Sequence, residues 1–198
     1  MCIRDRDWHI TIEDDELVDL ILKTNRLGAK DADLFMYISE AGNEVDLKAE
    51  HINQYIRDSS GMGFTAKNFR TWAATSRCAE RLAFLSSKRT AAEMKKWLKS
   101  IPSVESMDKL WSEGDWGVPT TDTGRNKAML AVIDTVAANL GNTRTVCRSS
   151  YIHPWFLDAW ADGRLGEAWA EFEDMRAMGN MTPGESTTLR VLKSVIKG

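Results

Sequence analysis

The sequence predicts a mainly helical protein with a small β element near its N-terminus, an α+β fold. Three observations lead to this prediction. Apolar residues recur at helical spacing over most of the chain, alternating stretches are short and lie near its beginning, and glycine or proline separates the helical stretches. With 198 residues, of which 43% are hydrophobic and 28% charged, the chain can bury a real core as a single domain over residues 1–198.

Two short strands are expected at the front of the chain. Residues 8–12 (Trp-His-Ile-Thr-Ile) alternate large and polar side chains, which is typical of a strand. Residues 34–38 form a second candidate strand, with residues 40–43 as its turn. These strands account for the small β element of the predicted fold.

Two helices are expected in the same part of the chain. Residues 13–16 (Glu-Asp-Asp-Glu) open the first, because acidic side chains are favoured in the first turn of a helix; this explains the acidic cluster better than a metal site does. Residues 48–57 form the second. The residues expected on the apolar faces are Leu17, Leu20, Ile21 and Leu27 in the first helix, and Ile52, Tyr55 and Ile56 in the second.

Helices continue through the rest of the chain. After the break at Gly61-Met62-Gly63, Thr65 is the expected N-cap of a long helix that runs to about Leu85, and a basic helix follows over residues 90–99. A helix over residues 126–140 stops at Gly141, and helix restarts after it. The last expected helical pieces are residues 155–162, 167–178 and 185–196.

Residues 101–124 are expected to form an irregular insertion. Pro102, Gly114, Gly117 and Pro119 interrupt this stretch, while Trp111 and Trp116 would give it an apolar anchor.

Composition and charge exclude several classes of protein. No apolar run is long enough to span a membrane, and the first nine residues lack the apolar core of a secretory signal. The three cysteines show no CxxC spacing and indicate reduced thiols in a cytoplasmic protein. Residues 61–100 carry nine basic and two acidic side chains in an otherwise acidic chain, which indicates either a polyanion-binding face or a solvated helical surface.

Three stretches carry the chemistry. Residues 64–75 read FTAKNFRTWAAT and place Lys67 and Arg70 one helical turn apart. Residues 140–143 read LGNT, and residues 146–154 read VCRSSYIHP. This ordered set resembles the catalytic domain of the type IB DNA topoisomerases, of the compact bacterial and poxvirus-like kind. The resemblance is good over residues 8–86 and 126–165. It implies the helical fold that these enzymes share with the tyrosine recombinases.

The resemblance assigns a role to each matching residue. Tyr151 would be the nucleophile, Arg70 would clamp the scissile phosphate, and Asn142 would be a second, neutral donor at a position where many members have histidine. Lys67 matches a position that contacts a backbone phosphate. Arg148 and Thr75 are further expected DNA contacts.

Elementary chemistry agrees with these assignments. Attack on a phosphodiester gathers negative charge on the phosphoryl oxygens, and the planar guanidinium of arginine can meet two of them at once. A phosphotyrosyl bond conserves the energy of the broken strand, so resealing needs neither ATP nor metal. The sequence accordingly has no GxxxxGK[ST] loop and no metal-ligand spacing, and no cofactor is expected.

Two further active-site residues of the family have no match here. The family uses an arginine and a general-acid lysine upstream of the strand matched by residues 8–12, and the lysine would fall near Arg6. Arginine is a poor proton donor because its pKa exceeds 12. The sequence is therefore expected to be a truncated fragment whose first six residues need not be native, with slow cleavage.

The resulting functional prediction is relaxation of supercoiled duplex DNA through a 3′-phosphotyrosyl intermediate, by a monomer in the cytoplasm that associates with the nucleoid. A tyrosine recombinase is the nearest rival function, although recombinases usually have His-x-x-Arg and Leu-Gly-His where this chain has Lys67-x-x-Arg70 and Leu140-Gly141-Asn142. A DNA-binding fragment without catalysis and a helical protein without a nucleic-acid role also remain open.

Overall fold

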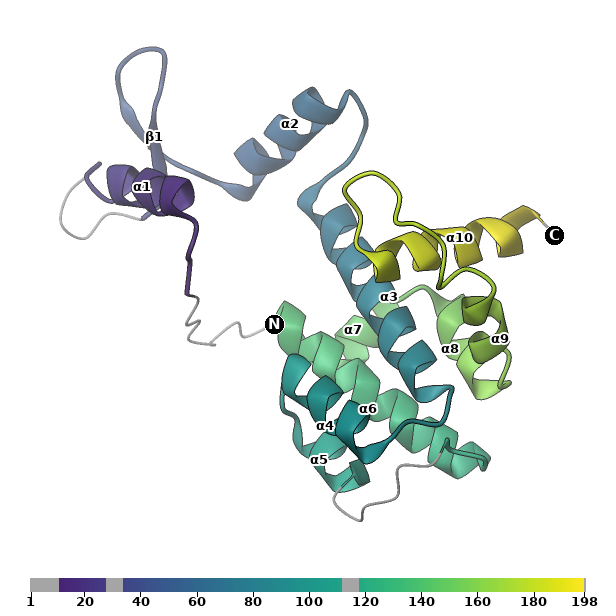
Figure 1. The fold of residues 1–198 in the computed structure, drawn as a ribbon. Helices are drawn as coiled ribbons and strands as arrows, with labels where there is room; N and C mark the ends of the chain where they lie inside the picture. Colours follow the sequence, from purple (N-terminus) through teal and green to yellow (C-terminus); the bar gives the residue numbers. More distant parts are fainter. Residues whose placement is uncertain (1–10, 28–33, 112–117, 198) are drawn as a thin grey trace. The chain divides into compact units, whose positions relative to one another are not determined.

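A computed structural model describes residues 11–27, 34–111 and 118–197 (Figure 1). The chain consists of two compact units, Met1–Lys67 and Asn68–Gly198. Ten helices and one two-stranded sheet lie within the described ranges. The expected class, mainly helical with a small β element, is confirmed. The expectation of a single domain over residues 1–198 stays a prediction.

The N-terminal unit contains the sheet. Its elements are α1 (Asp15–Thr24), β1 (Met36–Ile38), β2 (Glu44–Asp46) and α2 (Ala49–Ser60). The two strands pair antiparallel with Tyr37 opposite Val45, so the expected strand before the turn at residues 40–43 is confirmed. Its partner, β2, was not predicted from the sequence. Gly61 ends α2 in the left-handed conformation, which glycine adopts without steric cost.

Two expectations for this unit differ from the structure or lie partly outside it. Helical periodicity predicts that Ile52 and Tyr55 face inward, yet both side chains are exposed, Tyr55 by 72%. This expectation is wrong because periodicity identifies a shared face without identifying what covers it. Of the strand expected over residues 8–12, positions 8–10 lie outside the described residues, and Thr11 and Ile12 are not in a strand.

All regular secondary structure described in the C-terminal unit is helical. In chain order the helices are α3 (Ala66–Leu85), which begins at the border of the two units, α4 (Ala91–Ser100), α5 (Glu105–Trp111), α6 (Asp122–Leu140), α7 (Arg144–Ser150), α8 (Pro154–Ala161), α9 (Leu165–Ala170) and α10 (Pro183–Lys197). No helix within the described ranges is long and apolar enough to cross a membrane.

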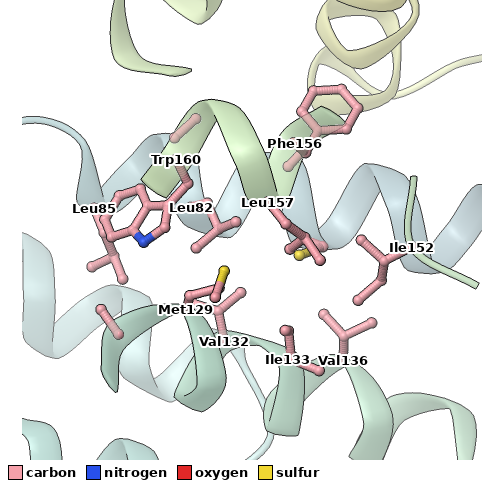
Figure 2. Packing of buried hydrophobic residues seen from close by; sticks show 14 of the residues in the cluster. Leu82, Leu85, Met129, Val132, Ile133, Val136, Ile152, Phe156, Leu157 and Trp160 are labelled. Carbon is pink, nitrogen blue, oxygen red and sulfur yellow. The ribbon is translucent and has the colours of Figure 1, made fainter. Parts of the chain in front are cut away.

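The core of this unit surrounds α6, which packs against α5, α7 and α8. Figure 2 shows side chains from α3, α6 and α8 meeting in the space between these helices. Each fully buried side chain of this kind contributes about 1.5–3 kcal/mol relative to its exposed state. The labelled side chains are Leu82 and Leu85 of α3, Met129, Val132, Ile133 and Val136 of α6, Ile152, and Phe156, Leu157 and Trp160 of α8.

A buried arginine links α3 to α6 beside this core. Arg81 is only 8% exposed; its Nη1 donates to Thr135 Oγ1 at 2.8 Å and its Nη2 donates to Asn139 Oδ1 at 2.7 Å. Burial, aided by the neighbouring Arg77, lowers the pKa of Arg81 to about 10, so the side chain remains charged at neutral pH. Because a buried charge is costly unless its donors are satisfied, these two bonds fix one position of α3 against α6.

The stretch expected to be irregular contains a helix. Residues 105–111 form α5, and its Met107 and Trp111 are buried in the core, while residues 112–117 lie outside the described residues. Helix α6 also begins earlier than expected, at Asp122, where the Thr121 side chain accepts from the Gly124 N–H. The expectation is wrong for α5 because only tertiary packing stabilises so short a helix.

Helix α9 is shorter than the helix expected over residues 167–178. It ends at Ala170, just before Glu171, Glu173 and Asp174. Negative side chains at the C-terminal end of a helix oppose the helix dipole, which explains why the apolar periodicity beyond this point does not produce helix.

We expect Leu82→Ala to lower the free energy of unfolding by about 2–5 kcal/mol, because Leu82 has no exposed surface and its loss leaves a cavity between helices. Urea denaturation followed by circular dichroism measures the change. Ile196→Ala is the control, since Ile196 is 77% exposed, and it should change stability by less than about 0.5 kcal/mol. Equal effects of the two substitutions would contradict this account of the core.

Candidate active site

Arg70 lies in α3 and reaches the end of α6. Its Nη2 donates a hydrogen bond to the carbonyl oxygen of Leu140 at 2.9 Å. Leu140 is the last residue of α6, where carbonyl groups have no partner within the helix and the helix dipole favours a positive charge. The guanidinium is therefore held at this helix end by both a hydrogen bond and the helix field.

The turn after α6 places Asn142. Gly141 adopts φ 64°, and the Asn142 N–H donates to the Ala137 carbonyl at 2.9 Å, which closes the helix in a Schellman-type turn. Thr143 then caps α7 by accepting a hydrogen bond from the Val146 N–H. Asn142 is thus fixed between two helices, two residues after the carbonyl that Arg70 contacts.

The side-chain amide of Asn142 has an unused donor. Among the described residues its buried Nδ2 has no hydrogen-bond partner. An unsatisfied buried donor costs about 1–3 kcal/mol and is rare in folded proteins. This donor, two positions after the carbonyl that Arg70 contacts, is thus left without a partner by the fold.

Tyr151 follows the C-terminal end of α7, whereas Thr143 caps its N-terminal end, and the Tyr151 ring contacts Arg70. Its backbone N–H donates to the Cys147 carbonyl, and its half-buried ring packs against the core. The Cζ of Arg70 lies 5.3 Å from the centroid of the Tyr151 ring, within the range of a cation–π attraction. Arg70 therefore contacts both the end of α6 and the tyrosine, across 81 positions of sequence.

The three remaining predicted residues lie in different settings. Lys67 is exposed in the first turn of α3 and is the last residue of the N-terminal unit. Arg148 is exposed in the last turn of α7, three residues before Tyr151. Thr75 is only 3% exposed, and its hydroxyl is bonded to the backbone beside Tyr151, which favours a role other than DNA contact.

Cys147 lies near the site as a neutral thiol. Burial raises its pKa to about 11, although the positive charge of Arg70 acts in the opposite direction. A thiol with this pKa is protonated and unreactive at neutral pH. Cys147 therefore serves the site as an apolar packing residue.

An ion pair that sequence reasoning missed holds α7 against α6. Asp134 of α6 accepts hydrogen bonds from both Nε and Nη2 of Arg144 in the first turn of α7, and from the hydroxyl of Ser106 in α5. The side chain of Asp134 is 19% exposed and that of Arg144 is 44% exposed. Arg144 lies between the two C-terminal motifs, but no sequence signal pairs it with a residue ten positions earlier on another helix.

The balance of forces on Asp134 favours its charged form. Burial alone would raise its pKa, but the hydrogen bonds from Arg144 and Ser106, together with the positive charge of Arg144, outweigh burial and lower the pKa. The ion pair thus joins three helices and steadies the turn that carries Asn142.

A comparison with known protein families gives a match over most of the chain. The model of the family described as "Eukaryotic DNA topoisomerase I, catalytic core" matches residues 9–158, a range that includes Arg70, Asn142 and Tyr151. No curated protein matches the chain. In the described residues, no three histidine, cysteine, aspartate or glutamate side chains are grouped so that they could hold a metal ion.

We expect Asp134→Asn to lower the free energy of unfolding at pH 7 by about 1–2 kcal/mol, because it weakens charge-assisted hydrogen bonds to a partly exposed partner. Since the pKa of Asp134 is lowered on folding, its stabilisation is complete above the unfolded pKa of about 4 and fades as the pH falls through the folded pKa. The difference between wild type and variant should therefore shrink below about pH 4.

Urea denaturation at several pH values measures this difference. Asp162→Asn is a matched control, because Asp162 pairs with Arg164 at 2.7 Å while both side chains are more than half exposed. The control should change stability by less than about 1 kcal/mol. A difference for Asp134→Asn that does not vary with pH would contradict the proposed charge dependence.

Proposed function

The chain belongs to the family of DNA topoisomerase I catalytic cores, and we propose that it relaxes supercoiled duplex DNA by transferring one strand's 3′ phosphate to Tyr151. Its substrate as a member of this family is DNA. The ordered motifs favour the compact bacterial and poxvirus-like kind, and Asn142, in place of a histidine, favours the bacterial branch. The matching family model carries the eukaryotic description, so this finer placement rests on the motifs alone.

The observation that supports this proposal most directly is the double contact of Arg70. Its Nη2 donates to the Leu140 carbonyl oxygen at the end of α6 at 2.9 Å, and its Cζ lies 5.3 Å from the centroid of the Tyr151 ring. The unused Nδ2 of Asn142 belongs to the residue two positions beyond the bonded carbonyl. A nucleophile, a cation and a neutral donor thus come from three separate segments of the chain.

The proposed cleavage step follows from these groups. The Tyr151 phenolic oxygen attacks phosphorus, a phosphorus–oxygen bond to tyrosine forms, and the bond to the 5′ oxygen of the next nucleotide breaks. Arg70 donates to the non-bridging oxygens and stabilises the negative charge that develops on them, and Asn142 adds a neutral donor. Religation reverses the same bonds, so it consumes no nucleotide.

Protons must balance in this step. The phenol loses one proton as it attacks, and the departing 5′ oxygen gains one. None of the three residues is suited to donate the latter: an arginine side chain does not release its proton, an amide is not acidic, and Tyr151 is the nucleophile. Solvent water therefore takes the phenol proton and supplies the one that the 5′ oxygen gains, and protonation of the leaving group is the slow part of the proposed reaction.

Binding of the duplex is proposed to depend on exposed basic side chains that contact phosphates. Arg148 and Lys67 are exposed within the motif stretches, and α4 carries further lysines at positions 95, 96 and 99. Contacts of this kind carry little base information and weaken steeply with salt, because binding releases counterions from DNA.

We expect the wild-type protein to relax a supercoiled plasmid and to leave a protein-linked nick when the reaction is stopped with detergent, whereas Tyr151→Phe should do neither, because phenylalanine has no attacking oxygen. Agarose and denaturing gels measure the two products. Tyr55→Phe is the matched control, since Tyr55 is 72% exposed on α2, and it should behave like wild type.

Different outcomes of this experiment would indicate different functions. Salt-sensitive DNA binding without any protein-linked nick would show that the protein binds DNA and does not cleave it. Strand exchange confined to defined sites would identify a recombinase. Absence of salt-sensitive DNA binding would overturn the proposal altogether.

A second prediction concerns Asn142. We expect Asn142→Ala to slow formation of the linked nick about 100-fold at saturating DNA, because loss of one preorganised donor to a developing oxyanion has an effect of this size. Single-turnover kinetics measures it. Asn126→Ala is the control, because Asn126 is exposed on α6, and it should leave the rate unchanged. A wild-type rate for Asn142→Ala would remove Asn142 from the proposed site.

A further inference from the structure

The hydroxyl of Thr75 contacts the backbone of Tyr151 and of His153. Thr75 lies on α3, five residues after Arg70, and is almost completely buried. Its Oγ1 donates to the Tyr151 carbonyl oxygen at 3.0 Å and accepts from the His153 N–H at 3.1 Å. One side chain thus bonds the backbone on both sides of Ile152.

These two backbone groups are ones that the neighbouring helices leave free. Tyr151 follows the end of α7, so its carbonyl oxygen cannot accept a bond within that helix, and His153 precedes α8, so its N–H cannot donate within that one. A threonine hydroxyl has one donor and two acceptor sites, and it satisfies both groups at once. Without it, a carbonyl and an N–H beside the core would lose their partner.

The consequence concerns the geometry of the catalytic pair. Arg70 and Thr75 lie on one helix, about 7.5 Å apart along its axis at about 1.5 Å per residue. Arg70 faces the Tyr151 ring while Thr75 holds the Tyr151 backbone, so α3 contacts the tyrosine at two points. Two contacts from one rigid helix restrict both the position and the direction of the phenol.

We propose that Thr75 is a positioning residue that aligns Tyr151 for attack, an inference that rests on the proposed role of Tyr151 as the nucleophile. Thr75 does not touch DNA in this assignment, which replaces the DNA-contact role expected from the sequence. Displacement of a reacting group by about 1 Å can cost about 100-fold in rate, so a buried hydroxyl can control cleavage without meeting the substrate.

The test compares three variants in single-turnover cleavage of a supercoiled plasmid, with DNA affinity measured separately by mobility shift. Thr75→Val keeps the shape and removes the hydroxyl, and we expect it to slow cleavage at saturating DNA about 10- to 100-fold with unchanged affinity. Thr75→Ser keeps the hydroxyl and should restore the rate to within a few-fold. Thr188→Val removes a buried hydroxyl that bonds the Gly184 carbonyl in α10, and should leave the rate unchanged.

Each contrary outcome has a distinct meaning. Weaker DNA binding by Thr75→Val with a normal rate at saturation would show a DNA contact and overturn the positioning role. Equal slowing by Thr75→Val and Thr188→Val, in samples with matched folded fractions by circular dichroism, would show that loss of either buried hydroxyl has the same effect, and would also overturn the positioning role. Absence of any linked nick with wild-type protein would overturn the proposed function itself, and the role of Thr75 with it.

Discussion

The position of one guanidinium organises this part of the molecule. Arg70 contacts the carbonyl at the end of α6 and the ring that follows α7, so it joins segments that the chain separates by about seventy and eighty residues. Both contacts favour a positive charge, because a helix C-terminus and the face of an aromatic ring each carry partial negative charge. The same charge that stabilises the fold here is available to a phosphate, since a guanidinium has five donors.

The site lies where helices end. The closing turn of α6 carries Asn142, Tyr151 follows α7, and His153 caps α8 with its own side chain. Helix ends leave backbone groups without partners, and α3 supplies partners through the side chains of Arg70 and Thr75. A rigid helix therefore satisfies the backbone of the irregular segments and, by the same bonds, fixes the groups that would carry out the chemistry.

Local chemistry explains what can be predicted from the sequence, and contacts between distant residues explain what cannot. The stop at Gly141 is predictable because glycine adopts positive φ, and the ordered motifs select Arg70 and Tyr151, which the structure brings into contact. The short helix α5, by contrast, is stabilised by burial of Met107 and Trp111, which leaves no local pattern. The hydrogen bonds of Thr75 cannot be predicted from the sequence either, because they join residues 76 and 78 positions apart.

Arg81 sets a constraint on how this architecture can vary. Because its buried charge has its acceptors on α6, sliding α3 by a single residue would separate the guanidinium from both oxygens while leaving it inside the protein. The separation of eleven residues between Arg70 and Arg81 thus fixes the distance along α3 between the core contact and the tyrosine contact. Inserting or deleting even one residue between them would move Arg70 away from Tyr151 or Arg81 away from its acceptors, a constraint that does not apply to the loops flanking α3.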